Sequence, residues 1–173
     1  GASDHLVSEA LYLDDPDGNG LEIYRDRLRT EWPRQNGQLL MDTLPLKADE
    51  VLAELEHDTT GWTGMPPGTA IGHLHLRVAD INETIAFYHG VLGFDLTILY
   101  GEQAVFMSAG GYHHHVGGNT WESAGITRRP ENVAGLALWE VILPTATDVA
   151  TVRRRVEVAN APVTPSENGF ITA

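Results

Sequence analysis

Three side chains near the start of the chain, His5, Tyr12 and Glu22, combine residue types that carry out acid–base and metal chemistry. An imidazole exchanges protons near neutral pH, a phenol donates a hydrogen bond, and a carboxylate binds hard metal ions. They can act together only if the residues between them turn all three toward one side of the same element.

The intervening residues predict a β-hairpin. Side chains alternate in character over residues 6–13, which indicates a strand with two distinct faces. The stretch Asp14–Gly20 contains proline, glycine and asparagine, which favour a tight reversal. A second strand follows over residues 21–24, with Glu22 and Tyr24 on one face. The hairpin is therefore expected to gather the imidazole, the phenol and the carboxylate on one side.

The spacing within this hairpin resembles the signature of the extradiol ring-cleaving dioxygenases, on the residues His5, Leu11-Tyr12, Asp15-Pro16, Gly18 and Glu22. These enzymes are the catechol 2,3-dioxygenase branch of the vicinal oxygen chelate superfamily, which also includes glyoxalase I and the bleomycin- and fosfomycin-resistance proteins. The resemblance implies that Glu22 is one ligand of a 2-His-1-carboxylate iron(II) site. It also implies that His5 and Tyr12 are catalytic residues that face the substrate. Ser3 departs from the family pattern, which prefers Gly, Asn, Thr or an aliphatic residue there.

Two other interpretations of the same stretch stay open. The spacing of Asp15, Asp17 and Asn19, with Asp26 further on, also fits part of an EF-hand calcium loop. Pro16 and the strands expected on both sides argue against that loop. A plain hairpin turn with solvated acids is the other alternative, in which the histidine is an exposed strand-edge residue.

Composition limits the class of protein. The 173 residues suit one domain of ordinary size, or one plus an incomplete neighbour, and 42% of them are hydrophobic. The formal net charge of −13 argues against nucleic acid and anionic membranes as partners. No apolar run approaches the roughly 20 residues of a membrane helix, and no signal peptide is visible. With no cysteine, histidine and carboxylates are the strong ligands, and we expect a cytoplasmic protein.

A second structured region begins near residue 71. Residues 71–78 alternate as a strand, and Asp80 is expected to cap a helix that Gly93 ends. Two further strands are predicted over residues 94–100 and 104–108. This β-α-β-β order resembles the opening of a glyoxalase-type module. In such modules a first-strand histidine seven residues before the capping Asp is often a metal ligand, which selects His73 rather than His75.

The remaining segments are predicted from the same kinds of pattern. Residues 26–70 are expected to be a linker in which Trp32 is buried and residues 46–56 form a packing helix. Another strand is predicted over residues 133–143. A helix then follows Thr145, and the strand after it includes residues 169–171.

A run of three histidines, His113 to His115, is unusual in composition. On a strand, consecutive side chains point to opposite faces, so only His113 and His115 could share one metal ion. The alternative, which we favour, is a strand end flanked by glycines whose imidazoles bond to the backbone.

The expected fold class is α+β, built from βαβββ glyoxalase-type modules with curled mixed sheets that form a cleft. We assign residues 1–25 to the last hairpin of one module, 26–70 to the linker, and 71–173 to a domain that lacks its own last hairpin. The chain thus resembles a protein truncated at both ends. Either it is a fragment, or the leading hairpin fills the missing place, within the chain or by exchange in a homo-oligomer. The second arrangement would bring Glu22 to His73 as metal ligands.

The resemblance implies an extradiol dioxygenase that acts on a small aromatic diol with O2, using Fe(II) or alternatively Mn(II). Two residues argue against an intact metal site in the domain of residues 71–173. Leu138 stands where the family has its second metal histidine, and Glu102 stands near the place of another histidine that faces the substrate. For this site to bind metal, His113, His115 or Glu140 would have to supply the ligand that Leu138 cannot. The alternative function is a non-catalytic, glyoxalase-type or resistance-type binding module of the same superfamily.

Overall fold

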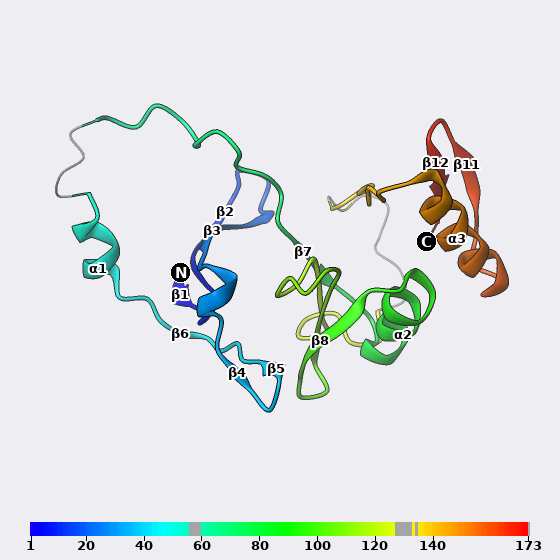
Figure 1. Cartoon of the computed structure of the whole chain (residues 1–173), viewed down its shortest axis with the longest axis horizontal. Coiled ribbons are helices and arrows are strands. Elements are labelled where there is room, and N and C mark those ends of the chain that lie inside the picture. Colours follow the sequence, from blue (N-terminus) through cyan, green and yellow to red (C-terminus); the bar gives the residue numbers. More distant parts are fainter. Residues whose placement is uncertain (56–59, 127–132, 134, 173) are drawn as a thin grey trace. The chain divides into compact units, whose positions relative to one another are not determined.

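The computed structural model describes residues 1–55, 60–126, 133 and 135–172, and the chain divides into two compact units, Gly1–Ile71 and Gly72–Ala173 (Figure 1). Each unit carries its own main sheet. The boundary falls where the sequence predicts the second structured region to begin, while the assignment of residues 1–25, 26–70 and 71–173 to family modules stays a prediction.

The first unit is built around the predicted hairpin, which is confirmed. Its described strands pair antiparallel in the order β3-β2-β1-β6. Their bounds are β1 (Ala2–Asp4), β2 (Ser8–Asp14), β3 (Gly20–Asp26) and β6 (Leu44–Pro45). Strand β6 was not predicted because it pairs with β1 from a distant part of the sequence, and β1 was not predicted because the turn that joins it to β2 contains Leu6 in a left-handed conformation that leucine rarely adopts. They place the hairpin in a sheet within its own unit, and hairpin exchange between copies stays a prediction.

The turn between β2 and β3 is held by the Asp15 carboxylate. Its Oδ1 atom accepts hydrogen bonds from the backbone N–H groups of Asp17 at 2.9 Å and Asn19 at 2.8 Å. Its Oδ2 atom accepts from the Asn19 side chain at 2.9 Å. These bonds, the side-chain one first, lower the pKa of Asp15. The carboxylate is committed to a turn between two strands, so the hairpin interpretation is confirmed over the calcium loop.

The apolar face of the hairpin is more open than its alternating pattern suggests. Leu11 and Leu13 on β2 are 50% and 44% exposed, and Leu21 and Ile23 on β3 are 45% and 44% exposed. An alternating apolar pattern predicts that one face of a strand is buried, and in the described structure these four side chains are not. The residues of β2 that are buried, Ser8 and Ala10, precede the exposed pair.

The rest of the first unit runs along its surface. Trp32 is buried as predicted, and its Nε1–H donates to the carbonyl oxygen of Arg27 at 3.0 Å. The helix predicted over residues 46–56 is shorter, and its apolar residues Leu52 and Leu55 are exposed, so it does not form the expected packing face. Glu56 lies outside the described residues. The elements are a 3-10 turn η1 (Arg29–Glu31), β4 (Arg34–Gln35), β5 (Gln38–Leu39) and α1 (Ala48–Ala53).

The second unit opens with a β-α-β-β-β succession. Its main sheet has the order β7-β10-β9-β8, in which β10 runs parallel to β7 and antiparallel to β9. The α+β class and the mixed sheet are therefore confirmed. The elements are β7 (Leu74–Arg77), α2 (Ile81–Ile85), a π-helical segment η2 (Ala86–Leu92), β8 (Asp95–Tyr100), β9 (Ala104–Ser108) and β10 (Val116–Asn119).

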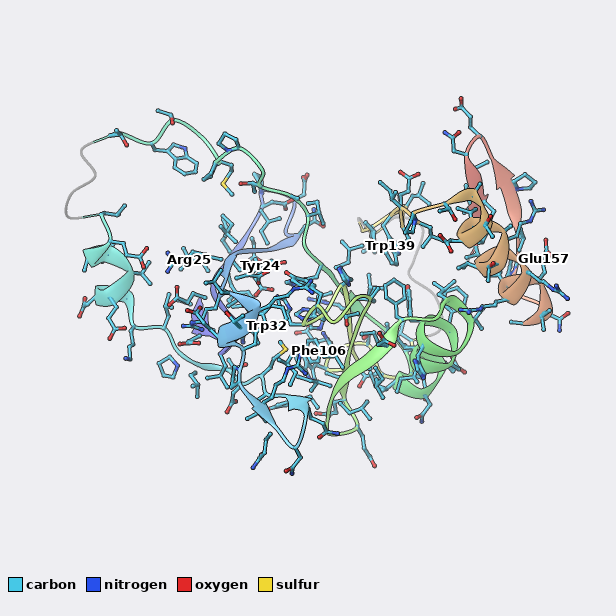
Figure 2. All side chains as sticks on the ribbon, viewed as in Figure 1. Tyr24, Arg25, Trp32, Phe106, Trp139 and Glu157 are labelled. Atoms are coloured by element: carbon cyan, nitrogen blue, oxygen red, sulfur yellow. The ribbon has the colours of Figure 1, made fainter. Side chains whose placement is uncertain are left out.

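One face of this sheet is covered by α2 and η2 to form the core. Asp80 caps α2 as predicted, its side chain accepting from the N–H of Glu83 at 2.8 Å. Gly93, in the left-handed region at φ 92°, ends the helical segment. Trp139, labelled in Figure 2, packs against this core. The buried core residues are Ile81, Phe94, Val105, Met107 and Val116.

Beyond the core, one predicted element is absent and two are confirmed. The described residues of the 133–143 segment form no strand, and Leu136 and Leu138 are 51% and 63% exposed. Alternating apolar residues make a strand only where a neighbouring strand accepts their hydrogen bonds. Thr145 and Asp148 cap the next helix reciprocally, as predicted. The elements that follow are α3 (Ala146–Val158), β11 (Thr164–Ser166) and β12 (Gly169–Ile171).

In the part of the chain that the structure describes, the helices are too short or too polar to cross a membrane.

The sheet of the first unit predicts a pattern of amide hydrogen exchange. Strand β2 pairs with β3 over Ser8–Asp14 and with β1 over Glu9–Leu11, so the amides of Glu9–Leu11 should exchange at least about tenfold slower than those of residues 60–65, which belong to no strand. Amides on the outer side of β3 serve as the internal control and should exchange faster than β2. Equal rates across β2 and residues 60–65, measured by NMR or mass spectrometry, would contradict this sheet.

Candidate functional site

The structure brings His5, Tyr12 and Glu22 into one hydrogen-bonded chain. Tyr12 on β2 stands directly opposite Glu22 on β3, and its hydroxyl donates to Glu22 Oε1 at 2.8 Å. His5 Nε2 lies 2.5 Å from the Tyr12 hydroxyl oxygen and 3.9 Å from Glu22 Oε1. The phenol therefore sits between an imidazole and a carboxylate, as the sequence predicted for the hairpin.

His5 reaches this chain from a turn rather than from the predicted strand. The turn joins β1 to β2, and Leu6 within it has a φ of 68°, a value that is unusual for a leucine. The N–H of His5 donates to the carbonyl of Ser8 at 2.8 Å, and the N–H of Leu6 donates to Asp4 Oδ1 at 2.8 Å. These bonds fix the direction in which the imidazole leaves the backbone.

An ion pair between Arg27 and Asp4 also stabilises the turn between β1 and β2. Arg27, just after β3, donates from Nη1 and Nη2 to the two carboxylate oxygens of Asp4, at 2.8 Å and 2.9 Å. This two-point contact, the strongest cause, lowers the pKa of Asp4. Arg25 on β3 makes a two-point contact of the same kind with Glu54, and its Nη2 also donates to Glu9 on β2 at 2.6 Å. The arginines thus position the turn and the ladder that carry the hydrogen-bonded chain.

The positions of the protons show what the hydrogen-bonded chain His5–Tyr12–Glu22 can do. The carbonyl oxygen of Asp42 can only accept, so His5 Nδ1, which is 2.8 Å from it, carries a hydrogen. When Tyr12 donates to Glu22, His5 Nε2 must then donate to the phenol oxygen, and the imidazole is a cation. When the imidazole is neutral, Nε2 accepts from Tyr12 instead. One proton can therefore be stored at His5 or passed along the chain.

The phenol itself is held neutral. Burial, and then the hydrogen bond to the Glu22 carboxylate, raise the pKa of Tyr12 above its usual range. A neutral phenol keeps its O–H as a donor, so Tyr12 can orient an oxygen of a bound molecule near neutral pH.

The second unit gathers a separate group of imidazoles. His73, just before β7, has its ring centroid 4.2 Å from that of His114 and 6.3 Å from that of His113. His113 and His114 are 1% and 6% exposed, and their Nδ1 atoms are 2.9 Å apart. Residues 112–115 precede β10 and do not alternate as a strand, so the reason for pairing His113 with His115 does not apply, while the sharing of one metal ion stays a prediction.

The favoured interpretation of the histidine run is confirmed at His115. His115 Nδ1 accepts a hydrogen bond from the backbone N–H of Ala109 at 3.1 Å.

His75 lies apart from this group. Its Nε2 is 2.9 Å from Asn119 Nδ2, and its ring contacts Phe106 and Trp121. Gly117, its register partner on β10, lies so close that an added Cβ would be 3.1 Å from the His75 Nδ1 atom.

The residues expected to hold iron are only partly assembled. Within the described ranges, with gaps at 56–59, 127–132 and 134, no group of three His, Asp or Glu side chains is placed to hold a metal ion. Glu22 belongs to the first unit and His73 to the second, so their shared ion stays a prediction. The Glu22 carboxylate, which Tyr12 orients, suits the role of one iron ligand. The described residues around it do not form a complete iron site.

Comparison with known proteins then decides the family. The profile of the Glyoxalase/Bleomycin resistance protein/Dioxygenase superfamily matches residues 70–165, more than half of the chain. The chain belongs to this superfamily. The resemblance carried by the hairpin and by the second region is thereby confirmed at the level of the superfamily.

Two known proteins are similar to the chain. The chain is 44% identical over 172 residues to "Catechol-2,3-dioxygenase" of Bacillus subtilis (strain 168). This match covers 98% of the chain and 60% of that protein. The chain thus spans about three-fifths of its relative's length. Among solved structures, lactoylglutathione lyase from Agrobacterium tumefaciens is 18% identical with a TM-score of 0.41, over 58% of this chain and 77% of that one.

The environment of Tyr12 predicts a late ionisation. Free tyrosine ionises near pH 10, and Tyr12 should ionise at higher pH because the charged form would be desolvated and would face Glu22. A difference titration of tyrosinate absorbance, wild type minus Tyr12→Phe, isolates this residue. Because the folded-state pKa is raised, the contribution of Tyr12 to stability is complete below pH 10 and is lost as pH rises further. Glu22→Gln should move the midpoint back toward 10, and a Tyr12 midpoint near 10 in the wild type would contradict the hydrogen-bonded chain.

Proposed function

We propose that the chain carries the acid–base and substrate-orienting part of an extradiol dioxygenase that opens catechol-type rings with O2. The observation that supports this most directly is the single hydrogen-bonded chain His5–Tyr12–Glu22, in which imidazole, phenol and carboxylate share one side of the hairpin. The 44% identity to a protein named catechol-2,3-dioxygenase supports the same substrate class.

Glu22 is the proposed metal ligand in the first unit, with Fe(II) as the metal and Mn(II) as the alternative. When bound, the metal would supply the electron transfer that activation of O2 requires. Tyr12 already donates to Oε1 of Glu22, and such a bond fixes the direction of a carboxylate ligand. His73 as a further ligand is part of the proposal, and it depends on bringing the two units together.

His5 is the proposed acid–base group. In its neutral state it has a proton on Nδ1, held by the Asp42 carbonyl, and a lone pair on Nε2. Nε2 can therefore take a proton from a hydroxyl of a catechol and hold it as the imidazolium. The same atom can return the proton to the opened product.

Tyr12 is the proposed orienting group. Its raised pKa keeps the O–H in place, and on substrate binding this single O–H would turn from Glu22 Oε1 to a substrate oxygen while the imidazole next to it exchanges protons. The bond between Tyr12 and His5 would then be replaced by bonds from each residue to the substrate.

A non-catalytic binding module is the second candidate, and one observation favours it. Leu138 stands at the position where the resemblance expects the second metal histidine, and its side chain is 63% exposed and cannot bind a metal. A module of this kind would keep the superfamily fold and bind a small molecule without turnover.

Ring-opening activity separates the two candidates. The chain is loaded anaerobically with Fe(II), given catechol and O2, and assayed for the yellow ring-opened product. His5→Gln and Tyr12→Phe should each lower kcat/KM by about 10²-fold or more, because each removes a proton-transfer or orienting group. Glu22→Gln should lower iron affinity by at least about 10-fold.

Asp14→Asn is the matched control, because Asp14 is an exposed carboxylate at the end of the same strand as Tyr12. It should leave both activity and iron binding unchanged. No product from protein that retains bound iron would sink the dioxygenase proposal and leave the binding module.

A further inference from the structure

The turn that carries His5 contains a residue in an unfavourable backbone conformation. Leu6 has a φ of 68°, in the left-handed region, where the Cβ of an L-residue comes too close to the backbone. Among the residues that the structure describes, the other non-glycine residues with a positive φ are Asn36 and Asn160, and asparagine tolerates this region better than leucine does. A conformation of this kind persists only where neighbouring groups impose it.

Arg27 contacts this turn on both sides of Leu6. Its backbone N–H donates to the carbonyl oxygen of Val7 at 2.8 Å. Its guanidinium donates from Nη1 and Nη2 to the two carboxylate oxygens of Asp4, at 2.8 Å and 2.9 Å. Asp4 precedes His5 in the chain and Val7 follows Leu6. One arginine therefore joins the two ends of the segment that contains the imidazole.

Asp4 passes this constraint on to Leu6. Its Oδ1 atom accepts hydrogen bonds from Arg27 Nη1 and from the backbone N–H of Leu6, each at 2.8 Å. The side chains of Arg27 and Asp4 are 28% and 21% exposed, so salt screens this pair less than it screens an ion pair on the open surface. Without the guanidinium the carboxylate would be free to turn toward water, and the Leu6 N–H would lose the acceptor that holds it.

Arg27 is itself held by groups outside the turn. Its carbonyl oxygen accepts from the Nε1–H of Trp32 at 3.0 Å, and Trp32, labelled in Figure 2, is buried. Its Nη2 atom also donates to Glu9 on β2 at 3.1 Å. The backbone and the guanidinium of the arginine each have a support besides the turn, so the arginine can impose a conformation on it.

The direction of the imidazole depends on the backbone of Leu6. Val7 is fully buried and β2 begins directly after it, so the chain that follows Leu6 is fixed in place. A change in the φ of Leu6 would therefore move the residues before it, of which His5 is the nearest. The His5 ring lies with Nε2 2.5 Å from the Tyr12 hydroxyl and Nδ1 2.8 Å from the Asp42 carbonyl, and such a movement would break both contacts.

We propose that Arg27 is a positioning residue for His5, which acts through Asp4 to hold Leu6 in its left-handed conformation and so keeps the imidazole at the Tyr12 hydroxyl. The functional part of this inference rests on the proposed function, because it assumes that His5 exchanges protons with a substrate. The geometric part requires no activity and can be measured on the chain alone.

Replacing Arg27 by methionine tests the geometric part. Arg27→Met keeps a long side chain but removes the donors to Asp4. The ring ¹⁵N and ¹H resonances of His5, followed by NMR of the whole chain without added metal, should move toward those of a solvent-exposed histidine. Arg34→Met, the same exchange at an exposed arginine that donates to the Gly37 carbonyl, should leave them in place. Unchanged His5 resonances in Arg27→Met overturn the proposal.

A second substitution separates the conformation of Leu6 from a general loss of stability. Glycine adopts a positive φ without a steric penalty, whereas alanine keeps the Cβ that makes this φ unfavourable. Arg27→Met combined with Leu6→Gly should return the His5 resonances most of the way to their wild-type positions, and Arg27→Met combined with Leu6→Ala should not. Equal recovery in the two double variants, or recovery in neither, overturns the proposal.

The functional part is tested on the iron-loaded chain with catechol and O2. A misplaced acid–base group slows the chemical step rather than weakening binding, so Arg27→Met should lower kcat by about tenfold or more and leave KM within about twofold. An unchanged kcat overturns the positioning role. If the wild-type chain shows no turnover, the proposed function fails, and the His5 resonances still decide whether Arg27 positions the imidazole.

A measurement on the unaltered chain covers the case in which Arg27→Met does not fold. Leu6 belongs to no strand, and its N–H donates to the Asp4 carboxylate, so its protection from hydrogen exchange reports this contact. The Leu6 amide should exchange at least about tenfold slower than the amides of residues 60–65. A Leu6 amide that exchanges as fast as these also overturns the proposal.

Discussion

The pairing of Tyr12 with Glu22 across the β2–β3 ladder is the constraint on which the first unit depends. Side chains alternate along a strand, so a slip of one residue in either strand would turn one of the two groups to the other face. The register is set at the turn, where the Asp15 carboxylate binds three donors and leaves little freedom for the chain between the strands. A local polar turn thus determines a contact between a phenol and a carboxylate several residues away.

The two units meet the cost of burying polar groups in different ways. In the first, the imidazole, phenol and carboxylate form hydrogen bonds with one another and remain partly exposed, so another molecule can reach them. In the second, His113 and His114 are buried, and their Nδ1 atoms form a hydrogen bond with each other. The first arrangement suits proton exchange with a substrate, and the second suits a group that remains in place.

The sequence predicted the elements whose signals are local. The hairpin, the capping of α2 by Asp80 and the capping box of Thr145 and Asp148 each depend on residues a few positions apart, and all three are present. Strand β6 was missed because it pairs with a distant segment, and β1 because the turn that leads from it into β2 is irregular. The positive φ of Leu6 has no sequence signal, since leucine rarely adopts it. The histidine run was misread because alternation was applied to residues that lie outside the strand.

The close approach of Gly117 to His75 limits how this part of the sheet can change over evolution. A side chain at position 117 would need the imidazole to move by a few tenths of an ångström. That imidazole also lies 2.9 Å from Asn119, two residues along the same strand. The three positions therefore cannot drift independently, because a larger residue at 117 would require the His75 ring to shift and so would disturb its contact with Asn119.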